Sequence, residues 1–199
     1  MTKADFRCYC LEKQRSVWAH NRLERDKRLC DLLYDEIRRS PGRDILLFWP
    51  LGSEPDLRAL LHRLRRERWN VYLPFMFGAS FRMVPFRYPM IRKQFGIYEP
   101  GFSNRKIKKI DIAVVPAVGV DAQGRRIGFG KGMYDRFFAT LKRKPKTIFV
   151  QLETCLTNEK ICDDYDVSAD VLLTPSACYD TAGTTHDKRN TLRRRNRHR

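Results

Sequence analysis

Apolar residues recur at three- and four-residue steps over residues 2–39, between lysines, arginines and glutamates. This spacing predicts a helix, because positions three and four apart lie on one helical face. A Ser-Pro-Gly sequence at 40–42 ends the pattern. The same kind of spacing predicts a helix over residues 57–68 and another that begins at Met133.

Short apolar runs lie between these helical segments, with turn residues at their ends. Such runs are typical of buried strands. The predicted strands cover residues 44–49, 69–74, 80–86, 112–120, 146–152 and 170–174. Strands that alternate with helices predict the α/β fold class: one three-layer domain whose central sheet, largely parallel or mixed, is flanked by helices.

The chain has 199 residues, of which 42% are hydrophobic, and this suffices for one domain with a sizeable core. We expect that domain to cover residues 1–179. Residues 180–199 lose the apolar periodicity and are rich in arginine, so we expect a basic tail without fixed structure. The chain shows neither a run long enough to cross a membrane nor a secretory signal, which predicts a cytoplasmic protein.

The stretch between residue 120 and Met133 is rich in glycine and basic residues. Glycine lets backbone N–H groups turn toward an anion, and a following helix presents its positive end at the same place. Lys131 and Arg126 add side-chain charge, so the predicted ligand is a phosphate. Asp135 follows closely, and a carboxylate there can help to hold Mg²⁺ beside nucleotide phosphates. The alternative role for Asp135 is to complement the helix dipole.

The loop differs from the two common phosphate-binding signatures. A P-loop needs serine or threonine after Lys131, and a dinucleotide fingerprint needs glycine where Met133 stands. The residues that form the pattern of this stretch, at fixed distances along the chain, are Val115, Pro116, Gly119, Asp121, Gly124, Arg126, Gly128, Gly130, Gly132, Tyr134, Asp135 and Arg136. This arrangement resembles the signature of the 5-formyltetrahydrofolate cyclo-ligase (5,10-methenyltetrahydrofolate synthetase) family. The family usually has phenylalanine, leucine and tyrosine where this chain has Val120, Ile127 and Met133.

Further segments carry the same resemblance. Lys3 and Arg7 match a family motif that faces the ATP phosphates, and they share one face at helical pitch. For so short a motif alone, a solvated basic face is the simpler interpretation. Residues 95–100 resemble a turn near the folate, and Asp166 matches a residue that assists the metal in some members. Cys155 stands where the family often has glutamine.

The resemblance implies ATP-dependent closure of 5-formyltetrahydrofolate to 5,10-methenyltetrahydrofolate, with release of ADP and phosphate through a phosphorylated formyl (iminium phosphate) intermediate. It implies catalytic roles for Lys131, Arg126 and Tyr134. The implied ATP-binding residues are Lys3, Arg7, Arg126, Gly128, Phe129, Gly130, Lys131, Gly132, Met133 and Tyr134. The implied substrate-binding residues are Trp49, Glu54, Phe129 and Tyr134. The implied Mg²⁺ ligands are Asp135 and Asp166. The alternative role for Glu54 is to cap a helix together with Ser53, and a tryptophan at the end of a strand, as Trp49 is, usually packs in the core.

The formal net charge of +17 predicts a polyanionic partner or a solvated basic surface. ATP and a folate, including a polyglutamylated one, are polyanions that satisfy this expectation without nucleic acid. Two alternative hypotheses remain: nucleic-acid binding through the tail, and a diverged paralogue that uses the ATP loop on another substrate. Met133 and Cys155 motivate the second. We expect a monomer.

Six cysteines and four histidines show neither the spacing of a zinc site nor that of a disulfide framework. Free thiols in a reducing compartment are therefore expected. The scarcity of histidine also argues against Ser/His or Cys/His catalysis, in which a base must lie beside the nucleophile.

Overall fold

The structure is a computed structural model that describes residues 1–18, 21–93, 96–105, 107, 109–180 and 193–194. Its helices are α1 (Lys3–Trp18), α2 (Arg22–Arg39), α3 (Arg58–Arg66) and α4 (Met133–Ala139). The helical pattern predicted over residues 2–39 thus forms two helices. They separate before Arg22, where Asn21 adopts the left-handed conformation with φ 56°.

Within the described residues, the central sheet has eight strands in the order β12-β11-β10-β9-β6-β1-β2-β3. From one edge to the other these are β12 (Arg193–Arg194), β11 (Cys178–Asp180), β10 (Val171–Leu173), β9 (Lys146–Val150), β6 (Ile112–Pro116), β1 (Asp44–Leu46), β2 (Asn70–Phe77) and β3 (Ser80–Pro85). The five strands from β10 to β2 run parallel, and β3, β11 and β12 add antiparallel pairs at the edges. The prediction of a mixed central sheet is confirmed.

Two small two-stranded sheets accompany the central one. One pairs β4 (Met90–Arg92) with β5 (Tyr98–Pro100), and the other pairs β7 (Gly119–Val120) with β8 (Arg126–Ile127). β7 and β8 form a hairpin beyond the carboxyl end of β6, where open α/β sheets place their sites.

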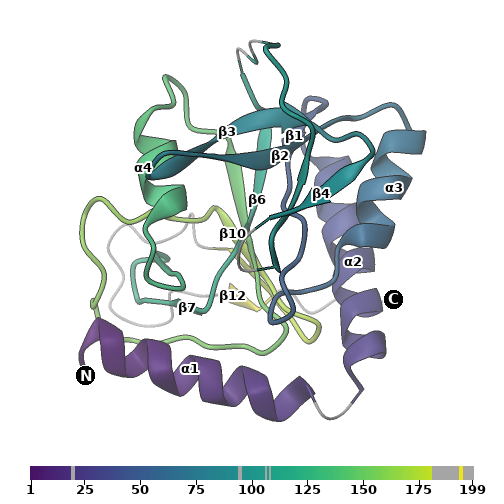
Figure 1. Ribbon diagram of the computed structural model, residues 1–199. Helices are drawn as coiled ribbons and strands as arrows, with labels where there is room; N and C mark the ends of the chain where they lie inside the picture. The colour runs from purple at the N-terminus through teal and green to yellow at the C-terminus, as the bar shows by residue number, and fades with distance from the viewer. Residues whose placement is uncertain (19–20, 94–95, 106, 108, 181–192, 195–199) are drawn as a thin grey trace.

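Helices cover both faces of the central sheet, which gives the predicted three layers (Figure 1). Strand β6 is buried along its whole length, as expected for an interior parallel strand with no solvent-facing side. On one face, Leu33 and Leu61 of α2 and α3 belong to the main core cluster with Ile148 of β9. On the other face, Phe137 of α4 packs with Phe149 in a second cluster.

Helix α1 lies at the carboxyl end of the sheet (Figure 1). Its buried Phe6 and Cys10 pack against the β7–β8 hairpin, and Gln14 donates from Nε2 to the carbonyl oxygen of Val118 (3.1 Å). On its far side, Lys13 donates from Nζ to the carbonyl oxygen of Thr154, in the loop after β9 (2.8 Å). The first helix is thus held beside two loops that are more than a hundred residues away in the sequence.

A disulfide joins Cys10 of α1 to Cys155 of the same loop. The prediction that all cysteines are free is therefore wrong for this pair, although Cys8, Cys30, Cys162 and Cys178 remain thiols. Sequence spacing could not indicate the pair, because 145 positions separate its members and only the docking of α1 brings them together. Free thiols are typical of a reducing compartment such as the cytoplasm. The disulfide therefore removes one reason to expect a cytoplasmic location.

The predicted tail is only partly described. Residues Arg193–Arg194 form strand β12, whose backbone pairs with β11. Residues 181–192 and 195–199 of the predicted tail lie outside the described residues. None of the helices in the described part of the chain combines the length and the apolar character needed to cross a membrane.

Replacing Gly119 with alanine is predicted to lower the free energy of unfolding by about 1–3 kcal/mol, because the hairpin packs tightly against α1. A Cβ at this position would lie 2.8 Å from Cε1 of Phe6 and 3.1 Å from Sγ of Cys10. Gly101→Ala is the matched control, since no atom lies within 4 Å of its added Cβ. Urea unfolding measures both variants. Equal unfolding free energies would contradict a close packing of α1 against β7.

Candidate active site

The β7–β8 turn is held in shape by the buried carboxylate of Asp121. Its Oδ1 accepts hydrogen bonds from the backbone N–H groups of Gln123 and Arg125 (both 2.9 Å), and its Oδ2 accepts one from Cys162 (3.1 Å). Gly124 completes the turn with φ 70°, a conformation that a side chain would strain. A single carboxylate therefore fixes the path of the chain into the glycine loop.

The glycine loop, residues 128–132, follows β8 and leads into α4. Gly130 and Gly132 adopt φ 95° and 60°, and a Cβ on Gly128 would lie 2.5 Å from a terminal nitrogen of Arg126. Glycine is thus required here by backbone conformation and by close approach. Helix α4 has only seven residues. The groups suited to binding an anion are therefore the loop amides and the basic side chains, and not the end of this short helix.

The loop borders a cavity of about 460 Å³. The structure brings nine of the predicted site residues to this cavity, from α1, β8, the glycine loop, α4 and the chain before β10: Lys3, Arg7, Arg126, Gly128, Gly130, Lys131, Gly132, Asp135 and Asp166. Arg7 donates from Nε to the carbonyl oxygen of Gly128 (2.8 Å), and its terminal nitrogens donate to none of the described residues. The exposed Lys131 side chain likewise forms no ion pair with the described part of the chain.

Arg126 lies beneath the loop and is buried. Its Nε donates to the carbonyl oxygen of Pro116 (2.8 Å), and its guanidinium carbon lies 4.9 Å from the centre of the Tyr134 ring. A terminal nitrogen lies 3.8 Å from Oδ2 of Asp135. Burial lowers the pKa of Arg126, an effect that the charge of Asp135 partly offsets. Arg126 is thus a fixed, buried charge under the glycines and not a mobile side chain within the loop.

Lys3 lines the cavity from the first turn of α1. Its Nζ forms an ion pair with Asp166 and a longer one with Oδ2 of Asp163 (3.3 Å). Burial alone would lower the pKa of Lys3, but the two carboxylates outweigh it and raise the pKa above the ordinary value. Lys3 is therefore charged at neutral pH, and it holds Asp166 in place.

Asp135 and Asp166 are the carboxylates of this cavity among the described residues. Oδ1 of Asp135 accepts from the backbone N–H of Val167 (3.1 Å), and Oδ2 of Asp166 accepts from that of Asp163 (2.7 Å). The described residues contain no cluster of three or more metal-binding side chains. That finding is compatible with Mg²⁺, which proteins commonly hold through one or two carboxylates, with substrate phosphates and water as the other ligands. Two oriented carboxylates beside a cationic loop fit this donor set.

Two of the predicted substrate residues, Glu54 and Tyr134, lie close enough to Arg126 to interact with its charge. Glu54 is buried, and its Oε2 accepts from the backbone N–H of Leu51 (2.8 Å). Burial raises the pKa of Glu54 to about 7, although the Leu51 hydrogen bond and the charge of Arg126 lower it in part. Burial also raises the pKa of Tyr134, and the charge of Glu54 adds to that effect. Arg126 thus links the phosphate side of the site electrostatically to Glu54 and Tyr134.

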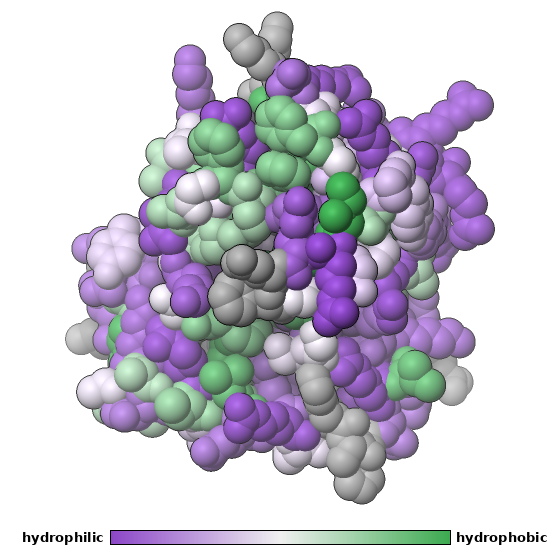
Figure 2. Space-filling model, in the orientation of Figure 1, coloured by the Kyte–Doolittle hydropathy of each residue, from purple (hydrophilic) through white to green (hydrophobic). Residues whose placement is uncertain are grey.

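Trp49 belongs to an aromatic cluster rather than to the deep core. Its ring centre lies 6.1 Å from Phe86, 6.3 Å from Tyr98 and 6.5 Å from Tyr88. Tyr88 and Tyr98 are exposed. Figure 2 shows apolar side chains gathered on the same face as β2, β3 and β4, whereas much of the remaining surface is hydrophilic. An accessible aromatic cluster of this kind suits a flat ring system.

Five predicted site residues do not line the 460 Å³ cavity: Trp49, Glu54, Phe129, Met133 and Tyr134. Phe129 is 38% exposed at the tip of the glycine loop, and Met133 packs against the core cluster under α4. Three residues outside the predicted site set also line it: Arg136, Ala139 and Tyr165. Arg136 donates to the carbonyl oxygen of Lys131 and, from Nε, to that of Ala79 (2.7 Å), so it braces the loop. Its place in the glycine signature was the available signal.

Fold and site together define an α/β protein in which a glycine-rich loop, a basic first helix and two carboxylates enclose one cavity. The model of the 5-formyltetrahydrofolate cyclo-ligase family matches residues 1–183 of this chain. The chain therefore belongs to that family. The family predicted from the sequence is confirmed. The prediction that the protein is an enzyme is confirmed with it.

Individual relatives agree with this assignment. The 5-formyltetrahydrofolate cyclo-ligase of Mycolicibacterium smegmatis is 31% identical over 144 residues, which cover 67% of this chain and 74% of the relative. That of Haemophilus influenzae is 32% identical over 116 residues, or 54% of this chain and 62% of the relative. The NMR structure of Aquifex aeolicus 5,10-methenyltetrahydrofolate synthetase superposes with a TM-score of 0.75 at 26% identity, over 95% of this chain and 98% of that one.

The raised pKa of Glu54 predicts a pH-dependent stability. The folded state favours the neutral carboxyl, so this group's contribution is most favourable below the unfolded value of 4.5 and is lost as pH rises toward 7. Between about pH 5 and about pH 8, the unfolding free energy should therefore fall by about 2–3 kcal/mol more in the wild type than in Glu54→Gln.

The glutamine variant is a close match, because its carbonyl oxygen can still accept from the N–H of Leu51. Urea unfolding at the two pH values measures the difference. Parallel pH profiles for the two proteins would show that Glu54 is not buried as a neutral acid.

Proposed function

We propose that this protein converts 5-formyltetrahydrofolate to 5,10-methenyltetrahydrofolate, with hydrolysis of ATP to ADP and phosphate. The observation that supports this most is that Lys3, Arg7 and Lys131 meet around one cavity beside the glycine loop. Three cationic side chains and open backbone amides are suited to a triphosphate. The family membership supports the choice of folate as the second substrate.

In the proposed reaction, the formyl oxygen attacks the γ-phosphorus of ATP and ADP leaves. Nitrogen N10 of the folate then attacks the activated formyl carbon and loses its proton to water, and the C–O bond breaks as the oxygen departs with the phosphate. The protein needs no nucleophile of its own for either step. Its task is to align the two substrates and to stabilise the charge that develops on the phosphoryl oxygens.

The cationic residues divide this task. Lys131 and Arg7 have N–H groups that donate to none of the described residues, so they are available to phosphate oxygens. Arg126 is fixed below Gly128 and beside Tyr134, which suits it to the region between nucleotide and folate. Because it is buried, its charge acts in a medium of low dielectric constant and is weakly screened.

Asp135 and Asp166 would hold Mg²⁺ in this proposal, and the metal would neutralise phosphate charge when bound. Asp166 is paired with Lys3. When substrates bind, Lys3 can leave this ion pair to contact a phosphate. Asp166 can then contact a cation in place of Lys3. Their ion pair therefore holds both side chains beside the cavity.

The folate side is assigned to Trp49, Glu54, Phe129 and Tyr134. The rings of the aromatic cluster around Trp49 provide a flat apolar surface for a pteridine. Glu54 can donate or accept a proton near neutral pH, which suits it to hydrogen bonding with a ring N–H. We further propose that the protein acts as a monomer in the cytoplasm and accepts polyglutamylated folate.

The direct test is the increase in absorbance from 5,10-methenyltetrahydrofolate when the full chain is mixed with 5-formyltetrahydrofolate, ATP and Mg²⁺. We expect product only when all three are present. ATP binding without product would instead favour a diverged enzyme that activates another substrate. The Cys155 disulfide, at a position where the family often has glutamine, is the feature that motivates this comparison.

Lys131→Ala is predicted to raise the ATP concentration needed for half-maximal turnover by about tenfold or more, because one charge-assisted contact is lost. Its unfolding free energy should stay within about 0.5 kcal/mol of the wild type, since the side chain is exposed. Lys27→Ala, at an exposed lysine of α2 away from the cavity, is the control. An unchanged ATP dependence would remove Lys131 from the proposed phosphate ligands.

A further inference from the structure

The structure has a second cavity, separate from the one beside the glycine loop. It has a volume of about 1340 Å³ and shares no lining residue with the 460 Å³ cavity in the described part of the chain. It lies at the opposite end of the sheet, where Gly42, Asp111 and Lys146 mark the amino ends of β1, β6 and β9. No step of the proposed reaction uses it.

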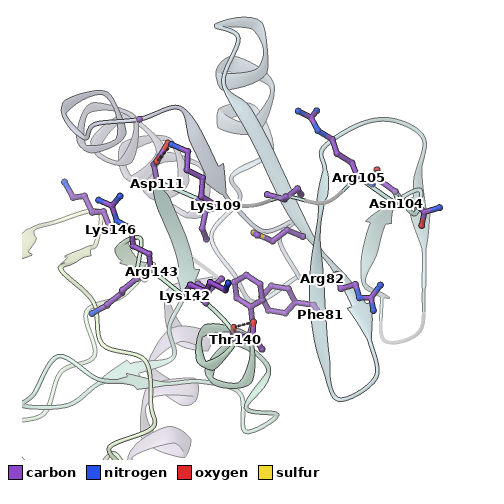
Figure 3. A pocket seen from close by; sticks show the side chains of 18 of the residues that line it. Phe81, Arg82, Asn104, Arg105, Lys109, Asp111, Thr140, Lys142, Arg143 and Lys146 are labelled. Atoms are coloured by element: carbon purple, nitrogen blue, oxygen red, sulfur yellow. Dashed lines mark hydrogen bonds and ion pairs between the residues drawn. The ribbon is translucent and has the colours of Figure 1, made fainter.

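The walls of this cavity are strongly basic (Figure 3). On one side lie Lys142, Arg143 and Lys144, in the turn between α4 and β9. Arg82 and Arg105 lie on the opposite side, as Figure 3 shows. Asp111 is the only carboxylate among the described residues that line the cavity. Cations thus face the space from two sides with almost no compensating negative charge.

Some of these cations already have partners. Lys146 pairs with Glu36 (2.6 Å), Lys109 pairs with Asp111 (3.3 Å), and Lys144 donates to Oγ of Ser168 (3.0 Å). The side chains of Lys142 and Arg143, by contrast, form no hydrogen bond or ion pair with the described residues. Their repulsion is unopposed except by water, and an anion between the walls would relieve it.

The floor of the cavity is apolar and aromatic. Phe81 of β3 stacks on Phe137 of α4 with ring centres 4.3 Å apart, and Met83 and Leu141 extend this surface. Phe102 is 45% exposed at the rim and has its ring centre 5.3 Å from that of Phe75. A solvated basic surface would not need such a floor.

We propose that this cavity is a second ligand site, for a small polyanion that carries a flat apolar ring. The two walls supply cations for anionic groups at separate points of the ligand, and the floor supplies contact area for the ring. A nucleic-acid strand fits less well, because the basic residues converge on a hollow instead of following an extended track. Phosphates and carboxylates are both suitable anions.

The test uses methoxypyrene trisulfonate, a fluorescent flat ring with three anionic groups, and measures its anisotropy on titration with the full chain. One series uses the wild type and the other uses Lys131→Ala, which removes a cation from the 460 Å³ cavity alone. We expect binding in both series, because the two cavities share no described residue. Failure of the proposed folate reaction would leave this result unaffected.

Variants on both walls test whether cations from the two sides contact the same ligand. Arg105→Glu and the double variant Lys142→Glu, Arg143→Glu should each weaken probe binding by about tenfold or more, since each removes charge-assisted contacts. The control is Lys27→Glu, Arg28→Glu, two exposed cations of α2 that line neither cavity, with less than about a twofold effect expected from long-range charge alone. All substituted positions are exposed, and circular dichroism checks the fold.

Two results would overturn the proposal: equal weakening in the wall and control variants, or tighter binding of a single-stranded oligoribonucleotide that the wall variants reduce as strongly. Phe102→Ala should weaken the probe but not inorganic pyrophosphate, because only the probe has a ring. Equal losses for both would also contradict the proposal. Displacement of the probe by a nucleoside diphosphate would assign phosphate as the natural anion, and displacement by a benzoylated glutamate peptide would assign carboxylate.

Discussion

The docking of helix α1 onto the β7–β8 hairpin is the contact on which the candidate active site depends. Phe6 and Cys10 pack against Gly119, where a Cβ would already be too close, and the Cys10–Cys155 disulfide joins the helix to the loop after β9. The same helix carries Lys3 to Asp166 and Arg7 to the carbonyl oxygen of Gly128. Since three separate segments border the cavity, loss of this docking would dismantle it.

Charge is arranged differently at the two ends of the sheet. At the carboxyl end, two cations are fixed by partners, since Arg126 lies beneath the glycines and Lys3 is held by two carboxylates, while Lys131 is exposed. At the amino end, basic residues face a larger cavity with little negative charge. The formal net charge of +17 is therefore not distributed evenly over the surface. Fixed, buried cations suit alignment of reacting groups, whereas exposed and unpaired ones suit reversible capture of an anion.

Much of the fold could be predicted from periodicity. The strands around β6 and β9 and the helix starting at Met133 were expected nearly where they lie, because a buried parallel strand requires a continuous apolar run. The glycine signature also gave the family. The break between α1 and α2 was missed, since Asn21 gives only a weak local signal. The large basic cavity was missed because its walls come from four separate segments, none of which has a motif.

The sequence by itself determined the α/β class, the family and the residue types of the loop, because each is a short-range pattern that the chain must carry to fold or to bind. The tertiary structure alone decided that Lys3 reaches Asp166, that Cys10 meets Cys155, and that Arg126 is buried below Gly128. Such contacts join positions far apart in the chain or depend on which side chain the core encloses. These contacts are determined by the packing of the whole domain, and the spacing of residues within a short segment does not predict them.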